Sequence, residues 1–107
     1  TPTALSTIAD NIISPSVFNL KQNYPNPFNP STSIDFEVFE SSNVSLNVYD
    51  LSGRLVKNLL SGNLNSGAYS IEWNGKNANG ISAAAGVYFY SISSKESTII
   101  KKMSLIK

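Results

Sequence analysis

The sequence contains neither cysteine nor histidine among its 107 residues. A thiol nucleophile, an imidazole base, a Ser-His-Asp triad, a Cys/His metal site and a disulfide framework are therefore excluded. Charged residues are also scarce, at 14%, and the net charge is only +1. This weak charge gives no electrostatic basis for binding nucleic acid or an anionic membrane surface.

Long apolar runs are missing as well. The longest nearly apolar stretch covers residues 83–90, far short of the roughly 20 residues that a membrane-spanning helix needs. We therefore expect no membrane insertion. Hydrophobic residues still make up 41% of the chain and aromatic residues 10%, which is enough to fill one packed core at this length.

Residues 1–16 differ in composition from the rest of the chain, being rich in Thr, Ser and Ala. They are predicted to be a linker from an upstream cargo domain. Leu5, Ile8 and Ile12 lie at helical spacing, so a short ordered element is the alternative. No basic start followed by an apolar stretch is present, and we expect any export signal to lie outside this piece. Residues 17–107 are predicted to form the folded domain.

The folded part consists of short segments in which apolar and polar residues alternate. Alternation with a period of two predicts half-buried strands. It occurs at 33–38, 44–48 and 69–73, more weakly at 55–60, and residues 87–92 are apolar on both faces, as in a central strand. Residues 99–106 close the chain as a further strand, and about seven strands are expected.

This pattern predicts an all-β fold, an immunoglobulin-like antiparallel β-sandwich. A small closed barrel is the alternative, whereas the lack of helical segments excludes parallel α/β architectures. The inward positions of the strands are expected to form the core. They are Ile34, Phe36, Val38, Val44, Leu46, Val48, Ile71, Trp73, Tyr88, Tyr90 and Ile92.

The segment from Asn74 to Gly80 places oxygen donors at alternating positions, like the first half of a calcium loop. Its donors are amides, at Asn74, Asn77 and Asn79, and neutral amides attract a divalent cation weakly. The segment is therefore predicted to be a pair of turns whose asparagines tolerate left-handed backbone, with no metal or cofactor. The acidic residues show no clustering, so a two-carboxylate glycosidase site is not expected and the chain is predicted not to be an enzyme.

A proline-rich segment and a group of aromatic residues can each be interpreted in two ways. Prolines at 25, 27 and 30 prevent full strand pairing. Their segment is either a rigid docking loop or a lead-in that holds Tyr24 and Phe28 over one end of the core. Trp73 with Tyr69, Tyr88 and Tyr90 could form a sugar-stacking platform, although core positions are the commoner use of such residues in a small sandwich.

Five motifs, in order, resemble those of the C-terminal sorting domains of the type IX secretion system (type A). The first covers residues 18–32 and includes the Asn-Tyr-Pro-Asn-Pro-Phe-Asn-Pro segment, and the others cover residues 44–53, 73–80, 86–90 and 101–103. The residues that define the first and fourth motifs are Tyr24, Pro25, Asn26, Pro27, Phe28, Asn29, Pro30, Gly86, Tyr88 and Tyr90. Asn74 and Ser91 depart from the aspartate and the basic residue usual in the family. That family is similar to the immunoglobulin-like domain of flagellar hook-capping proteins.

The resemblance implies a non-catalytic carrier domain at the end of a secreted enzyme or adhesin. It implies recognition by the outer-membrane type IX translocon and by processing and attachment proteins. The attached cargo would then reach the surface or surroundings of a Gram-negative bacterium through the periplasm. The terminal residues expected to be recognised are Lys101, Lys102, Met103, Leu105, Ile106 and Lys107.

The final strand supports this expectation physically. A terminal strand is the easiest element to peel from a sandwich edge and to offer to a partner. Its three lysines add a local charge of +3, and its apolar residues, with Ile100 among them, are expected to serve as anchors. Alternatively, the lysines only protect an exposed edge from aggregation.

The main alternative function is an accessory immunoglobulin-like spacer or carbohydrate-binding module of a secreted polysaccharide-degrading enzyme. A self-assembling structural domain is a weaker alternative, and we expect a monomer.

Overall fold

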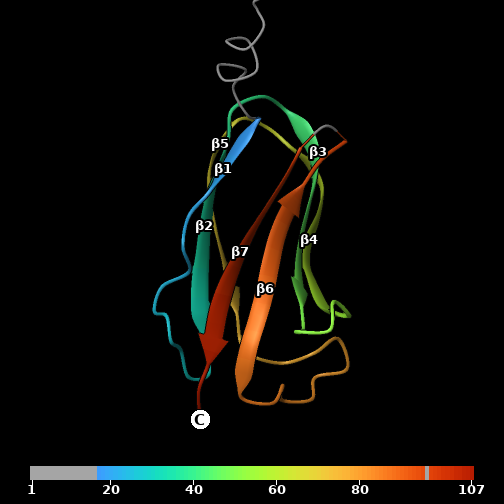
Figure 1. Cartoon of the computed structure of the whole chain (residues 1–107). Coiled ribbons are helices and arrows are strands. Elements are labelled where there is room, and N and C mark those ends of the chain that lie inside the picture. The colour runs from blue at the N-terminus through green and yellow to red at the C-terminus, as the bar shows by residue number, and fades with distance from the viewer. Residues whose placement is uncertain (1–16, 96) are drawn as a thin grey trace, which may run out of the picture.

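The computed structural model describes residues 17–95 and 97–107, which form a two-layered β structure (Figure 1). The predicted linker, residues 1–16, lies outside the described residues. The described part contains seven strands and no helix. The strands are β1 (Phe18–Leu20), β2 (Thr32–Val38), β3 (Ser42–Tyr49), β4 (Leu55–Leu64), β5 (Gly67–Trp73), β6 (Gly86–Ser93) and β7 (Thr98–Leu105).

The strands form two separate sheets. One has the order β1-β2-β5 and the other β4-β3-β6-β7, and all neighbouring strands are antiparallel. Figure 1 shows the two sheets stacked face to face. The predicted immunoglobulin-like sandwich is therefore confirmed, and the barrel alternative is wrong because the sheets do not close on one another. In the described part of the chain, no helix is long and apolar enough to cross a membrane.

Strict alternation fixes the register of the central strands. In β2, Ile34, Phe36 and Val38 are buried while the residues between them are not. In β3, Val44 and Leu46 are likewise buried, as is Val48. Because side chains of a strand point alternately to its two faces, a shift of one residue would expose every one of these side chains. The core therefore lies between the inner faces of the two sheets.

The predicted core is confirmed with one exception. Ile71, in the edge strand β5, packs against the core but is only partly buried. Five further core residues were not predicted, because they come from short or irregular segments and from the last strand. They are Phe18, Leu20, Phe28, Met103 and Leu105.

Trp73 lies at the centre of one end of the core and is 1% exposed. The centroid of its ring system lies 5.7 Å from that of Phe28 and 5.5 Å from that of Tyr88. Its indole N–H donates to the carbonyl of Lys76 at 2.9 Å. The side chain thus contributes both apolar contacts and a satisfied polar group.

Replacing Trp73 by Ala is expected to lower the free energy of unfolding by about 3–5 kcal/mol, since it removes a large buried side chain and leaves a cavity. Urea denaturation of the purified domain measures this loss. Leu51 is 70% exposed and provides a control, because Leu51→Ala should change stability by less than about 0.5 kcal/mol. A loss below about 1 kcal/mol for Trp73→Ala would contradict the packing described here.

Candidate functional site

The terminal strand β7 is an edge strand, paired only with β6 within its sheet. The residues expected to be recognised fall into two groups in the folded domain. Met103 and Leu105 are buried in the core, at 1% and 2% exposure. Lys101 is half-buried, whereas Lys102, Ile106 and Lys107 are exposed. A partner can therefore contact the second group on the folded domain, but reaches Met103 and Leu105 only if the strand leaves the sandwich.

Ile100, expected to be an apolar anchor for a partner, has a side chain that is 61% exposed in the folded domain. Odd-numbered residues of β7 face the core, and Ile100 lies on the opposite face with Lys102. Ile106, just after the strand, is likewise 50% exposed. These two side chains thus add exposed apolar surface at the end of the chain, within reach of a partner.

Residues 22–30, here called the proline clasp, hold the C-terminal half of β7 along its outer edge. The Phe28 N–H donates to the Ser104 carbonyl at 3.0 Å, and the Ile106 N–H donates to the Phe28 carbonyl at 2.9 Å. The side chain of Asn26 accepts from the Ser104 N–H at 3.0 Å. The side chain of Gln22 donates to the Lys102 carbonyl at 2.8 Å. The proline clasp and β7, which lie about 80 residues apart in the sequence, are thus joined by hydrogen bonds.

Phe28 anchors the proline clasp in the core. Its side chain is 1% exposed and packs against Trp73. Tyr24, by contrast, is 80% exposed, so the prediction that both aromatic residues cover the end of the core is wrong for Tyr24. Its backbone forms an antiparallel bridge with Ser33, which turns its side chain away from the protein. All three prolines of the clasp, with Asn26 and Asn29 between them, are exposed.

A buried polar network joins the start of the clasp to β6. The Asn23 N–H donates to the Tyr90 hydroxyl at 2.8 Å, and that hydroxyl donates to the Lys21 carbonyl at 2.8 Å. The Asn23 side chain donates to the Thr32 hydroxyl at 3.0 Å, which in turn donates to the Pro25 carbonyl at 2.8 Å. Buried polar groups need such partners. Sequence analysis placed Asn23 and Thr32 in the first motif but did not predict their buried polar role, because no local pattern reveals a partner distant in the sequence.

Gly75 lets the loop after β5 approach the clasp closely. Its φ is +76°, and a Cβ atom there would lie 2.7 Å from the carbonyl oxygen of Pro30. Only glycine both adopts this positive φ readily and leaves room for the carbonyl oxygen of Pro30. Gly86 begins β6, opposite Leu105 in β7, and Tyr88 is buried with its hydroxyl donating to the Ala84 carbonyl at 2.6 Å. The residues of the family motifs therefore surround the end of the sandwich at which the clasp meets β7.

The loop from Asn74 to Gly80 forms turns, as predicted, but by a different mechanism. Asn77 accepts from the N–H groups of Asn79 and Ile81 through its side-chain oxygen, and Asn74 accepts from Lys76 in the same way. None of the described non-glycine residues has a positive φ, so the expectation of left-handed asparagines is wrong. The glycines take that conformation. Among the described residues, no group of three or more Asp, Glu, His or Cys could hold a metal ion.

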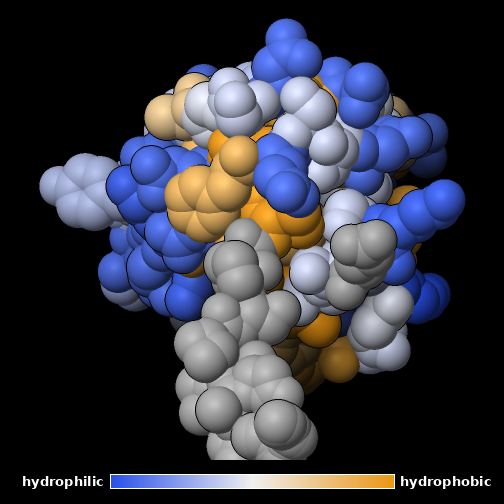
Figure 2. All heavy atoms as spheres, turned by 90° about the horizontal axis from the view of Figure 1, so that it is seen from above, coloured by the Kyte–Doolittle hydropathy of each residue, from blue (hydrophilic) through white to orange (hydrophobic). Residues whose placement is uncertain are grey.

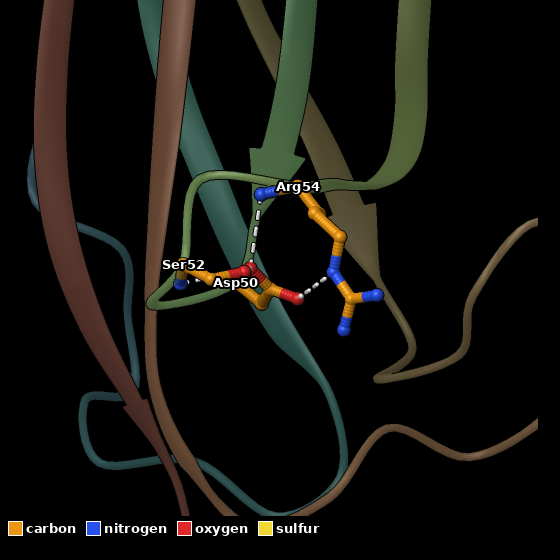
Figure 3. A network of polar contacts seen from close by, with 3 residues as sticks. All are labelled: Asp50, Ser52 and Arg54. Atoms are coloured by element: carbon orange, nitrogen blue, oxygen red, sulfur yellow. Dashed lines mark hydrogen bonds and ion pairs between the residues drawn. The ribbon is translucent and has the colours of Figure 1, made fainter.

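A second turn, after β3, is fixed by Asp50 (Figure 3). Its carboxylate accepts from the Ser52 hydroxyl at 2.7 Å and from the N–H groups of Ser52 and Arg54 at 2.9 and 3.0 Å. It also lies 3.4 Å from the Arg54 side chain. The hydrogen bond from the Ser52 hydroxyl is the main cause that lowers the pKa of Asp50. The cleft beside it, of about 470 Å³, therefore contains a carboxylate whose role is to fix the turn.

The aromatic platform for sugar binding, the less common alternative raised for these residues, is not present. Trp73, Tyr88 and Tyr90 are buried, and the ring of Tyr69 stacks on that of Phe36 at 5.3 Å. Side chains that fill the core cannot present a face to a pyranose ring. This interpretation of the four residues is therefore wrong.

The opposite end of the sandwich contains the turns that follow β2 and β6. Figure 2 views this end and shows apolar surface between hydrophilic side chains. Phe39 is 53% exposed, and a cleft of about 400 Å³ includes Val17, Glu40 and Lys95 in its lining. The Phe39 N–H at this end donates to the Val17 carbonyl at 2.7 Å.

The hydrogen bond that the Ser104 N–H of β7 donates to the Asn26 side chain predicts a local effect when it is removed. Asn26→Ala should speed amide hydrogen exchange at Ser104, because that N–H loses its acceptor. The free energy of unfolding should fall by about 1 kcal/mol. Asn79→Ala, at an exposed loop side chain, is the matched control. Unchanged exchange at Ser104 in the Asn26 variant would show that the clasp does not hold this strand.

Burial of Tyr90 predicts a loss of stability in alkali. Desolvation raises the pKa of its hydroxyl from 10.0 to about 12, against the opposing effect of the hydrogen bond from Asn23. The unfolded chain therefore releases this proton first, and the free energy of unfolding should fall as pH rises from about 10 to about 12. Urea denaturation as a function of pH measures the decline. Tyr90→Phe should be less stable at neutral pH but decline less in alkali, and an equal decline would contradict this cause.

Comparisons with known proteins place this geometry in context. No curated protein matches the sequence. Among solved structures, latent dimeric PorU from Porphyromonas gingivalis is similar, with a TM-score of 0.67 and 24% identity over 88% of this chain. PorZ, described as an essential surface component of the type IX secretion system of the same organism, has a TM-score of 0.57 and 23% identity over 80% of this chain. The chain spans only 10% of that PorU chain and 11% of that PorZ chain.

A flagellar protein shows the same fold. FlgD from Xanthomonas campestris, a hook-capping protein, has a TM-score of 0.55 and 23% identity over 84% of this chain and 62% of its own. These identities establish a shared fold. The model of the FlgD Ig-like domain family matches residues 28–98, from the proline clasp to the start of β7. Since this match covers more than half of the sequence, the chain belongs to the FlgD Ig-like domain family.

Proposed function

We propose that residues 17–107 are a non-catalytic C-terminal sorting module, which directs an attached extracellular enzyme or adhesin through the type IX secretion system to the cell surface. The observation that carries the proposal is the junction of the proline clasp with β7. It unites the first and last of the five motifs that resemble the sorting domains, and it gives each of them a role in positioning the terminal strand.

The position of β7 suits a recognition signal. The strand is paired on one side by β6, and its exposed lysines lie at an edge that a partner can approach without unfolding the core. Edge strands and chain ends are the elements most readily offered to a partner as an added strand. Residues 1–16 would then be the linker to the cargo, and the translocon with its processing and attachment proteins would be the partners.

Similarity in fold supports the proposal from a second direction. Domains of this shape occur in PorU and in PorZ, the latter described as a component of the type IX system. A sandwich of this kind is thus compatible with proteins of that system. The carbohydrate-binding alternative loses its main basis, because its aromatic platform is buried.

The experiment uses charge reversal of two exposed lysines. A reporter with an export signal is fused in front of this chain and produced in a bacterium with a type IX system. Deleting residues 101–107 would also remove Met103 and Leu105 from the core, so it would confound recognition with folding. Lys102→Glu with Lys107→Glu changes only exposed side chains. We expect the reporter to accumulate in the periplasm instead of reaching the surface or medium.

Lys76→Glu with Lys95→Glu provides the matched control, because these lysines are also exposed but lie outside β7. Both double variants should keep the melting temperature of the parent domain, measured on purified protein. Export of the β7 variant at the level of this control would contradict the proposal, because the terminal lysines would then not be read.

A further inference from the structure

We propose that the outer face of the four-stranded sheet binds an extended glycan chain built of neutral, β-1,4-linked hexoses. The inference goes beyond the sorting function and does not depend on it. The surface is distinct from the aromatic platform excluded above, because its side chains point away from the core. Since the described residues form two layers (Figure 1), no strand or helix of residues 17–95 and 97–107 covers this face.

A row of largely apolar side chains crosses this face at the end of β3. Tyr49 of β3 lies opposite Phe89 of β6, and Phe89 lies opposite Lys102 of β7. On its other side Tyr49 lies opposite Leu55 of β4, whose side chain is 59% exposed. Neighbouring strands are about 4.8 Å apart, which is close to the length of one pyranose unit in an extended chain. The row therefore offers one side chain to each successive sugar.

The ring of Tyr49 leans along β3. Its hydroxyl accepts from the side-chain amide of Asn47 at 3.3 Å, two residues back on the same face. Strand side chains usually stand roughly perpendicular to the sheet, so the hydroxyl reaches this short neighbour only if the ring is inclined. Tyr49 and Phe89 are both half-buried, which leaves part of each ring accessible. The negative face of such a ring attracts the axial C–H groups of a β-linked hexose.

Amide and hydroxyl side chains beside this row form a connected polar network. The Asn58 amide donates to the side-chain oxygen of Asn47 at 2.7 Å, and the Asn47 amide donates to the Ser45 hydroxyl at 3.2 Å. The network joins β3 to β4, and Asn58 is exposed. Side chains already held in place lose little freedom on binding. This arrangement therefore favours hydrogen bonds to the hydroxyl groups of a sugar.

The hydroxyl of Ser91 is a buried polar group without a partner. Ser91 lies on the same face of β6, between Asn47 of β3 and Ile100 of β7, and is only 4% exposed. Among residues 17–95 and 97–107, no hydrogen bond is made by its hydroxyl. Buried polar groups nearly always have such a bond. A sugar hydroxyl resting between Asn47 and Ile100 would supply it.

The charge of the face favours a neutral ligand. Among the outward residues of its four strands, all in the described part of the chain, Lys102 is the one charged side chain. The outer face of the other sheet, by contrast, carries Asp35, Glu37 and Glu72. A single cation attracts a polyanion weakly. Ring stacking and hydrogen bonding therefore determine what this face binds.

The test titrates cellohexaose, a β-1,4-linked glucose oligosaccharide, into the ¹⁵N-labelled protein and follows its amide resonances. Saturable shifts are expected at the backbone of Phe89 and at the side-chain amides of Asn47 and Asn58. Maltohexaose has the same composition, but its α-1,4 linkages make the chain coil, so it should bind much more weakly. Sodium chloride at about 1 M should leave the affinity unchanged, because screening weakens charged contacts only.

Variants separate stacking, hydrogen bonding and charge. Tyr49→Ala should weaken binding by about tenfold, because it removes a stacking ring, whereas Tyr49→Phe should retain most of the affinity. Ser91→Ala should weaken binding by about fivefold through the lost hydrogen bond. It should not lower the melting temperature, since it removes a polar group without a partner, and it serves alone if Tyr49→Ala does not fold. Lys102→Gln should leave the affinity unchanged, as should Tyr24→Ala, at a tyrosine that is 80% exposed outside this sheet.

Several results would overturn the inference. They are the absence of saturable shifts with cellohexaose, equal binding of cellohexaose and maltohexaose, and shifts that map outside this face. A greater loss of affinity for Lys102→Gln than for Tyr49→Ala would also contradict it, because the contact would then be ionic. So would the same shifts on raising the protein concentration without sugar, since a second copy would then occupy the face. The measurements use purified protein, so they do not depend on export through the type IX system.

Discussion

The packing of Phe28 against Trp73 is the contact on which the recognition end of the domain depends. Phe28 belongs to a segment that cannot form a regular strand, because prolines flank it. Its burial brings that segment into the core, and only then can its backbone reach Ser104 and Ile106. One apolar contact therefore determines the course of the proline clasp and, through it, the position of the terminal strand.

Three further constraints converge on the same place. Tyr90 accepts from Asn23 and fixes the start of the clasp, whereas Gly75 leaves room for Pro30 at its end. Trp73 is held between them by its bond to the Lys76 carbonyl. Each constraint alone would add little stability. An intramolecular hydrogen bond replaces a hydrogen bond to water, so its net contribution to the free energy of folding is small. Together they fix a loop that has almost no regular secondary structure.

The fold could be predicted from alternation because, in a regular strand, the order of apolar and polar residues indicates which side chains are buried. Residues 33–38 and 44–48 show a clean period of two, and both proved to be strands with the expected inward side chains. The site could be predicted only in part. That Phe28 and Leu105 are neighbours follows from pairing across most of the chain, and no local pattern encodes such a contact. The exposure of Tyr24 was missed for a related reason, since the bridge to Ser33 determines its direction.

The clasp also constrains when the domain can be completed. Its contacts with β7 join residues separated by 78 and 80 positions, so they can form only after nearly all of this domain has been synthesised. The finished edge therefore requires residues 104–106: a polypeptide that ends before Ser104 lacks the partners of Phe28 and Asn26, and it cannot display the surface described here.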